Sequence, residues 1–283
     1  VHRLLLLFGV SLLLAGCAGQ GLPRVIYLAR HGQTEWNRQG RFQGDPDLDP
    51  IGYINRVSLW RLLRGEPLVA IYTSERQRTR RTAELLAREL RLPVETRAAL
   101  NEIDSGVFEG ICIAHVVPQR LRPEDQRCLV PARGSSPEPA LAYLRGAMTE
   151  AARRRPTGRW PLGENDTDVA QRSAGFVEEL RRGLQDRTVL VVGHGVVNKL
   201  LLHQLMGWAA ALLPDLRQEN DQVFRIEPGE SGPPRLALYT PQRGWRPCNA
   251  TPAPTDRTLD CSPARGPGAP WIVPGQGVTT AGA

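Results

Sequence analysis

Residues 25–37 read VIYLARHGQTEWN, a short apolar run that passes directly into a polar motif. The run at 25–29 follows Pro23 and is typical of a strand buried in a parallel sheet. Open α/β sheets bind ligands beyond the carboxyl ends of their strands, so a site is expected at Arg30, His31 and Gly32. A guanidinium can fork onto phosphate oxygens, and glycine lets the backbone approach an anion closely.

Strand-like and helix-like segments alternate along the rest of the chain. Further apolar runs predict buried strands over 68–72 and 188–192, then a final pair over 223–226 and 236–239. Amphipathic spacing predicts helices over 54–63, 78–90, 140–154, 167–184 and 196–206. Asp166 is the expected N-cap of the helix that begins at residue 167. The alternation predicts an α/β fold of three layers, α/β/α, with a mainly parallel central sheet and helices on both faces.

The composition is that of a soluble globular protein with a packed core. The chain has 283 residues, of which 41% are hydrophobic and 23% charged, and a formal net charge of +7. Arginines such as Arg80, Arg81 and Arg88 are scattered over expected helix faces, so we interpret the positive charge as solvated surface. No nucleic-acid-binding motif accompanies it, and we expect no nucleic-acid partner.

The beginning of the chain has the layout of a secretory signal peptide. A positively charged start leads into an apolar run that ends in small residues, over residues 1–16. This run is shorter than the ~20 apolar residues that a membrane-spanning helix needs. Residues 14–17 read LAGC and resemble the bacterial lipoprotein processing box, which implies cleavage before Cys17 and acylation of Cys17, for example with palmitate. The alternative is an ordinary signal peptide that is cut nearby, with Cys17 incidental.

The lipoprotein resemblance implies a membrane-anchored protein of the bacterial cell envelope. More than one acyl chain gives stable anchoring. Ala18 follows Cys17 and offers no retention signal of the Asp type, so we expect the periplasmic face of the outer membrane.

The other cysteines are compatible with disulfide bonds in an oxidising compartment; they are Cys112, Cys128, Cys248 and Cys261. Bonds between neighbours, 112 with 128 and 248 with 261, would close short loops. Four cysteines allow three pairings, and the sequence does not choose among them. None of them lies in a CxxC array, so a zinc site is not expected.

Three regions follow from these patterns. Residues 1–16 are the expected signal peptide, and residues 17–242 form the expected main folded domain, with a less regular insert at about 111–160. After residue 242 the chain becomes rich in Pro, Gly and Thr, which predicts an irregular tail over 243–283.

The octapeptide RHGQTEWN at residues 30–37 resembles the signature of the histidine phosphatase (phosphoglycerate mutase-like) superfamily. The resemblance predicts further elements in a set order, and matching residues are Arg78 within TSERQRTRRTA, Glu102 within LNEIDSG, the pair Gly163-Glu164, and VVGHG with His194 and Gly195. It extends from about Arg24 to Tyr239 and weakens over the insert. Glu75 and Arg76 depart from the acidic/Pro and Leu pair that is usual in the family.

The resemblance implies a histidine acid-type phosphatase that hydrolyses phosphate monoesters through a phosphohistidine on His31. Glu102 would be the general acid/base, and a backbone carbonyl would hold the other ring nitrogen of His31. The catalytic set that it implies is His31, Glu102, His194, Arg30 and Arg78. The phosphate-binding set is Arg30, Asn37, Arg78, His194 and Gly195. Two arginines and a histidine supply the positive charge, so we expect no metal ion and no cofactor.

Two other functions remain open from the sequence. One is a phosphotransferase of the phosphoglycerate mutase type; the other is a catalytically silent lipoprotein that binds a phosphorylated ligand. Taken singly, a lone His194 is more often structural, Glu102 is more often a surface carboxylate, and Arg78 is more often a solvated helix residue. Their occurrence together in the family's order favours the phosphatase. The expected substrate is a small-molecule or envelope phosphomonoester; its identity and the oligomeric state stay open.

Overall fold

The computed structural model describes residues 24–116, 138–154, 157–208, 217–229, 232–248 and 261. The expected signal segment 1–16, Cys17 and Cys128 lie outside the described residues. So does the expected tail, apart from 243–248 and Cys261.

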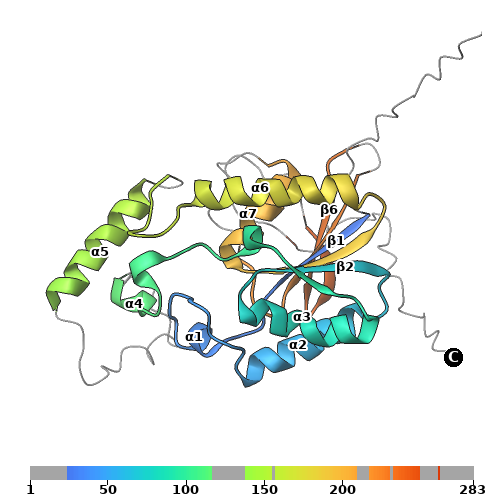
Figure 1. The fold of residues 1–283 in the computed structure, drawn as a ribbon, viewed down its shortest axis with the longest axis horizontal. Helices are drawn as coiled ribbons and strands as arrows, with labels where there is room; N and C mark the ends of the chain where they lie inside the picture. Colours follow the sequence, from blue (N-terminus) through green and yellow to red (C-terminus); the bar gives the residue numbers. More distant parts are fainter. Residues whose placement is uncertain are drawn as a thin grey trace, which may run out of the picture.

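A seven-stranded sheet forms the centre of the molecule (Figure 1). Its strands are β1 (Val25–Arg30), β2 (Leu68–Thr73), β3 (Val94–Thr96), β4 (Thr188–Gly193), β5 (Val223–Glu227), β6 (Arg235–Thr240) and β7 (Gly244–Pro247). The spatial order is β3-β2-β4-β1-β5-β6-β7. The first four in this order run parallel, and β5 to β7 run antiparallel to their neighbours. The sheet is therefore mainly parallel around β1 and β4, as the apolar runs predict.

Helices cover both faces of this sheet. Residues of β1 that alternate along the strand enter two different cores: Ile26 and Leu28 pack with α6 (Asp166–Gly183) and α7 (Gly195–Met206). Tyr27 and Ala29 pack with α2 (Pro50–Leu63) and α3 (Gln77–Leu90) on the opposite face. Figure 1 shows the two helix layers on either side of the strands. The three-layer α/β/α prediction is confirmed.

The remaining elements are short or belong to the insert. They are α1 (Glu35–Arg38), the 3₁₀ turns η1 (Ala98–Leu100) and η2 (Gly106–Phe108), α4 (Ile113–Val116) and α5 (Glu138–Arg153). Helix α5 extends away from the sheet beyond α4 (Figure 1). The helix predicted over 140–154 is thus present with nearly the same bounds.

Several details differ from the sequence-based expectations, and one of them is that helix α2 begins at Pro50, four residues before the start of the predicted helix. Strand β7 lies inside the segment predicted to be an irregular tail, because residues 244–247 pair with β6. The N-cap of α6 is Asn165 rather than Asp166: its side chain accepts from the Asp168 backbone N–H, and Asp168 accepts from the Asn165 backbone N–H in return. This reciprocal pair satisfies the backbone N–H groups of Asn165 and Asp168, which have no partner inside the helix. Asp166 is already the first residue of the helix.

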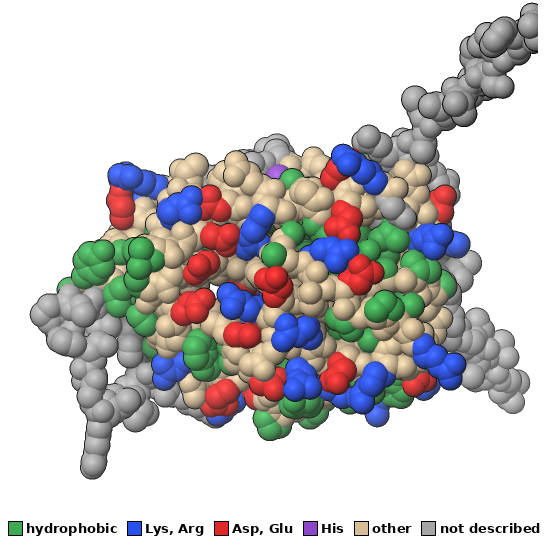
Figure 2. Space-filling model, viewed as in Figure 1, with side chains coloured by type: hydrophobic (Ala, Val, Ile, Leu, Met, Phe, Trp, Pro, Cys, Tyr) green, Lys and Arg blue, Asp and Glu red, His purple; other side chains and the backbone are tan. Residues whose placement is uncertain are grey.

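Cys248 at the end of β7 forms a disulfide with Cys261. Cys112 is also disulfide-bonded. No helix within the described residues is both long enough and apolar enough to cross a membrane. Figure 2 shows Lys and Arg side chains interspersed with Asp and Glu on the face in view, which agrees with charged residues that serve as solvated surface there.

Candidate active site

Two histidines that are far apart in sequence meet at the carboxyl ends of neighbouring strands. Arg30 at the end of β1 pairs in register with Gly193 at the end of β4, and the His31 backbone N–H donates to the Gly193 carbonyl at 3.0 Å. His31 and His194 are the next residues of the two strands. Their ring centroids lie 5.1 Å apart, so both imidazoles face one small volume.

His31 is held in a single tautomer. Its Nδ1 lies 2.8 Å from the Gly32 carbonyl oxygen, which only accepts, so Nδ1 carries the hydrogen and Nε2 keeps its lone pair. The side chain is 1% exposed. Burial lowers the pKa of His31 well below its ordinary value, and the charges of Arg78 and Arg30 lower it further. The ring is therefore neutral at physiological pH, as a nucleophile requires.

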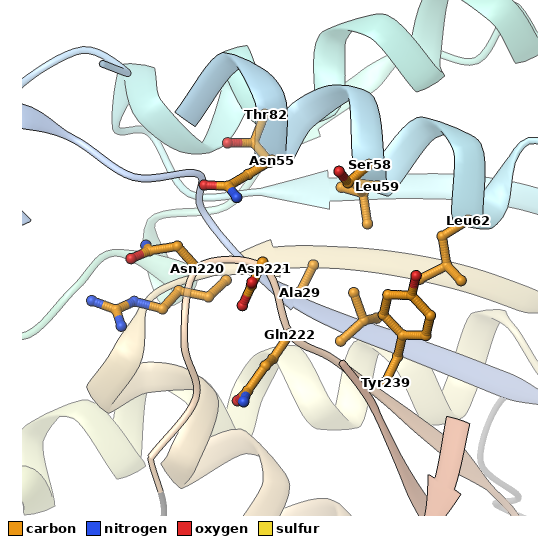
Figure 3. A pocket seen from close by; sticks show the side chains of 12 residues that line it. Ala29, Asn55, Ser58, Leu59, Leu62, Thr82, Asn220, Asp221, Gln222 and Tyr239 are labelled. Atoms are coloured by element: carbon orange, nitrogen blue, oxygen red, sulfur yellow. The ribbon is translucent and has the colours of Figure 1, made fainter. Parts of the chain in front are cut away.

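Polar side chains hold the backbone around His31 in place through hydrogen bonds. The Gly32 N–H donates to Thr82 Oγ1 at 2.8 Å, and the Gln33 N–H donates to Asn55 Oδ1 at 3.0 Å. Asn220 Nδ2 donates to the His31 carbonyl at 2.7 Å. Thr82, Asn55 and Asn220 also line a pocket beside this loop (Figure 3). These bonds keep residues 31–33, the His31 loop, in place.

Arg78 brings a fully buried guanidinium to the histidines. It belongs to the first turn of α3 and is 0% exposed; its Nη1 donates to the Gly44 carbonyl and lies 3.7 Å from Asp45 Oδ1. Its Nε and Nη2 have no hydrogen-bond partner among the described residues. Burial lowers the pKa of Arg78 to about 10, so it stays charged at neutral pH. Two buried donors without partners suit an anion.

His194 is the second buried imidazole. Its Nε2 lies 2.8 Å from Ser74 Oγ, and its Nδ1 has no partner within the described residues. Burial lowers the pKa of His194 well below its ordinary value, followed by the nearby charge of Arg78. A neutral ring with one anchored nitrogen is suited to hydrogen-bond a ligand through the other.

Arg30 and Glu102 flank Gly195 at the start of α7. A Cβ atom at Gly195 would lie 3.7 Å from Glu102 Oε2 and 3.9 Å from Arg30 Cζ. Arg30 Nη1 donates to the Gln218 carbonyl at 2.8 Å. The Glu102 carboxylate accepts from the backbone N–H groups of Ile103 at 3.0 Å and Val196 at 3.2 Å. A carboxylate and a guanidinium thus lie close together, beside the residue that follows His194.

Asn37 is used for local structure. Its Oδ1 accepts from the Thr34 backbone N–H, and its own N–H donates to Thr34 Oγ1, both at 3.1 Å, which forms the capping box of α1. Oδ1 is thereby engaged. A phosphate contact by Nδ2 stays a prediction.

The loop that carries Glu102 is tied to α6 by Arg172, which the sequence analysis did not single out. Arg172 forms a two-pronged ion pair with Glu164, both contacts at 2.9 Å, and donates to the carbonyls of Ala99 and Glu102. Glu164 also accepts from the Asp104 backbone N–H. Glu164 of the Gly163-Glu164 motif therefore helps to hold the Glu102 loop against α6.

Within the described residues, no group of three or more His, Cys, Asp or Glu side chains has an arrangement that suits a metal ion. The positive charge around the histidine pair comes from guanidiniums.

Known proteins resemble this chain in sequence and in fold. The Histidine phosphatase superfamily (branch 1) matches residues 26–156 and 131–240. Human 6-phosphofructo-2-kinase/fructose-2,6-bisphosphatase 4 is 32% identical over 208 residues, which are 73% of this chain and 38% of that protein. The isoform 3 protein of Homo sapiens is also 32% identical and is covered over 34% of its length. The chain thus spans little more than a third of these curated relatives.

Two solved structures illustrate the likeness in three dimensions. A mycobacterial glucosyl-3-phosphoglycerate phosphatase in complex with VO3 has a TM-score of 0.58 and 27% identity, over 75% of this chain and 96% of that one. The alpha-ribazole phosphatase from Shigella flexneri has a TM-score of 0.60 and 22% identity, over 74% of this chain and 93% of that one. The second likeness concerns the fold alone.

Proposed function

This chain belongs to the histidine phosphatase superfamily, and from that premise we propose that it hydrolyses phosphate monoesters through a phosphohistidine intermediate on His31. The observation that carries the proposal is the opposed pair of neutral imidazoles, 5.1 Å apart, beside the buried guanidinium of Arg78. The phosphatase named among the similar solved structures, at 27% identity, supports hydrolysis as the reaction.

The phosphate group would be held by charge and hydrogen bonds. Arg78 offers Nε–H and Nη2–H, which lack partners among the described residues, and Arg30 adds a second guanidinium. A hydrogen bond from the Ser74 hydroxyl to His194 Nε2 leaves His194 Nδ1–H to donate to the phosphate. Such preorganised donors stabilise the charge that spreads over the equatorial oxygens during transfer.

The first chemical step forms the phosphoenzyme. The Nε2 lone pair of His31 attacks phosphorus in line while the bond from phosphorus to the leaving oxygen breaks. Glu102 gives its proton to that oxygen, which leaves as an alcohol. The bond from His31 Nδ1–H to the Gly32 carbonyl stabilises the positive charge that the ring gains when its other nitrogen becomes phosphorylated.

The second step returns the enzyme to its starting state. The Glu102 carboxylate takes a proton from water, and the water oxygen attacks phosphorus as the bond from phosphorus to Nε2 breaks. Products are inorganic phosphate and neutral His31. The Arg172 and Glu164 contacts would keep Glu102 in position through both proton transfers.

The decisive experiment traps the intermediate. We expect p-nitrophenyl phosphate turnover, and labelling of the protein when a radiolabelled phosphomonoester is quenched in alkali, which preserves phosphohistidine. His31→Ala abolishes both turnover and label, whereas His203→Asn, which changes a histidine in the last turn of α7, retains both. A His31→Ala variant that keeps most of its rate would remove His31 from the mechanism. Discharge of the label to monophosphoglycerate rather than to water would favour the phosphotransferase, and an inert protein would favour the binding lipoprotein.

We further propose that the protein is exported and lipid-anchored through Cys17 at the periplasmic face of the outer membrane. The support is the sequence of residues 1–17 alone. Radiolabelled palmitate fed to expressing bacteria is expected to label the protein and not the Cys17→Ser variant, with the label in the outer-membrane fraction. Equal labelling of both proteins, or none, contradicts lipidation at Cys17.

A further inference from the structure

Arg76 is a charged residue at the edge of the site that the proposed mechanism does not use. It occupies the N-cap position of α3, two residues before the buried Arg78. An arginine here adds a charge to those of Arg30 and Arg78.

Among the described residues, the guanidinium of Arg76 has no hydrogen-bond or ion-pair partner. The residue is half-buried. The neighbouring arginines of α3 differ: Arg80 donates to the Glu75 carbonyl, and Arg81 lies near Asp47 and Glu84. Carboxylates close to Arg76 are also engaged, since Glu75 accepts from Asn101 and Asp45 accepts from the Gln77 backbone.

The backbone of Arg76 is linked to His194 through the hydroxyl group of Ser74. Its backbone N–H donates to Ser74 Oγ at 3.1 Å, and the same hydroxyl contacts His194 Nε2 at 2.8 Å. The charge of Arg76 also contributes to the lowered pKa of His194, after burial and the larger contributions of Arg78, His31 and Arg30. Arg76 therefore lies beside the site, at the hydroxyl group that contacts His194.

A phosphate dianion is already matched by Arg30, Arg78 and His194, so the charge of Arg76 is in excess of what a simple monoester needs. We propose that Arg76 binds a second anionic group of the substrate, either a carboxylate or a phosphate other than the one that is cleaved. This inference rests on the proposed phosphatase activity and narrows its substrates to phosphomonoesters that carry another negative charge. Guanidinium groups are well suited to both anions, because they can bind either one through two parallel hydrogen bonds.

The test compares substrates that differ in the second anion alone. One pair is 3-phosphoglycerate and glycerol 3-phosphate; the other is fructose 1,6-bisphosphate and fructose 1-phosphate. For the wild type, we expect kcat/KM to be larger for the doubly anionic member of at least one pair. Which pair shows the preference distinguishes a carboxylate from a phosphate. In Arg76→Leu this preference falls about tenfold, mainly through KM, as expected for loss of a partly exposed charged hydrogen bond; Arg76→Lys restores part of it.

The control is Arg88→Leu, which removes the same charge from an exposed position in the last turn of α3. It is expected to leave the preference as in the wild type. An unchanged preference in Arg76→Leu overturns the proposal, as does a loss of equal size for both members of each pair and for p-nitrophenyl phosphate. Turnover of p-nitrophenyl phosphate by the wild type keeps the two hypotheses apart, because that activity supports the phosphatase whatever Arg76 does.

Discussion

At the residue scale, the two buried imidazoles make stability depend on pH. Burial, more than any other cause, holds the pKa of His31 and of His194 well below the 6.5 of an exposed histidine. As pH falls through 6.5, the unfolded chain therefore binds protons that the folded chain refuses, and folding is penalised. The contribution is fully present above the unfolded pKa and is lost progressively at lower pH.

We predict that the free energy of unfolding falls by about 2 to 3 kcal/mol between about pH 7.5 and pH 5.5, summed over both rings. Urea unfolding in a buffer without phosphate measures it. The His31→Asn variant is expected to show about half of this dependence, since one of the two rings is gone. Stability that stays flat over this interval would mean that the folded protein accepts the protons.

Single residues of the site differ in how far the sequence reveals them. Arg30, His31 and His194 follow directly on apolar runs, so both their neighbourhood and their strand-end location can be predicted. The sequence does not predict the roles of Thr82, Asn55 and Asn220. Each is a single polar residue that belongs to no pattern, and its partner is a backbone group of the His31 loop. Only tertiary packing brings such pairs together.

At the scale of elements, the backbone of the His31 loop lies in close contact with the backbone at the start of α2. A Cβ atom on Gly32 would lie 2.6 Å from the Gly52 carbonyl oxygen, a distance that forces one of the two segments to shift. Because the Gly32 carbonyl also orients His31, a shift here moves the imidazole of His31. The close approach explains why glycine follows His31.

We predict that Gly32→Ala lowers kcat about a hundredfold, since a displacement of about 1 Å at a reacting group costs that much. The matched control is Gly65→Ala, where a Cβ would meet nothing within 4 Å. Steady-state kinetics with p-nitrophenyl phosphate measure both variants, and circular dichroism checks that they fold. Normal kcat in Gly32→Ala would show that the loop tolerates the contact.

The long elements follow from the sequence, and the short ones do not. β1, β4, α3 and α7 have either continuous apolar runs or clear helical spacing, and their observed bounds differ from the expected ones by a residue or so. β3 and α1 are three and four residues long. Segments of this length hold too few residues for a period to emerge, and their form is set by the neighbours with which they pair.

The same limit applies to β7, whose four residues GWRP resemble a loop in composition. Its strand conformation comes from pairing with β6, and the rings of Trp245 and Tyr239 lie 5.4 Å apart across that pair. The helix cap at Asn165 illustrates a second limit. Asn165 and Asp166 are both good capping residues, and the choice depends on which side chain reaches Asp168.

At the scale of the whole molecule, the sheet has a parallel half and an antiparallel half. The parallel half carries His31 and His194 at the ends of β1 and β4, while β5 to β7 extend the sheet on the other side of β1. The disulfide between Cys248 and Cys261 joins the end of this extension to the chain beyond it. The disulfide thus holds Cys261 at the end of β7.

The central place of β1 also has a consequence for biosynthesis. Strand β1, which leads to His31, is synthesised before both of its neighbours in the sheet. These are β4 at Thr188–Gly193 and β5 at Val223–Glu227. In a nascent chain that has been synthesised only as far as α5, the segment VIYLA has neither of its partner strands. Such an exposed apolar segment is prone to aggregation and is of the kind that chaperones bind. His31 and His194 come together only after β4 has been synthesised and has paired with β1.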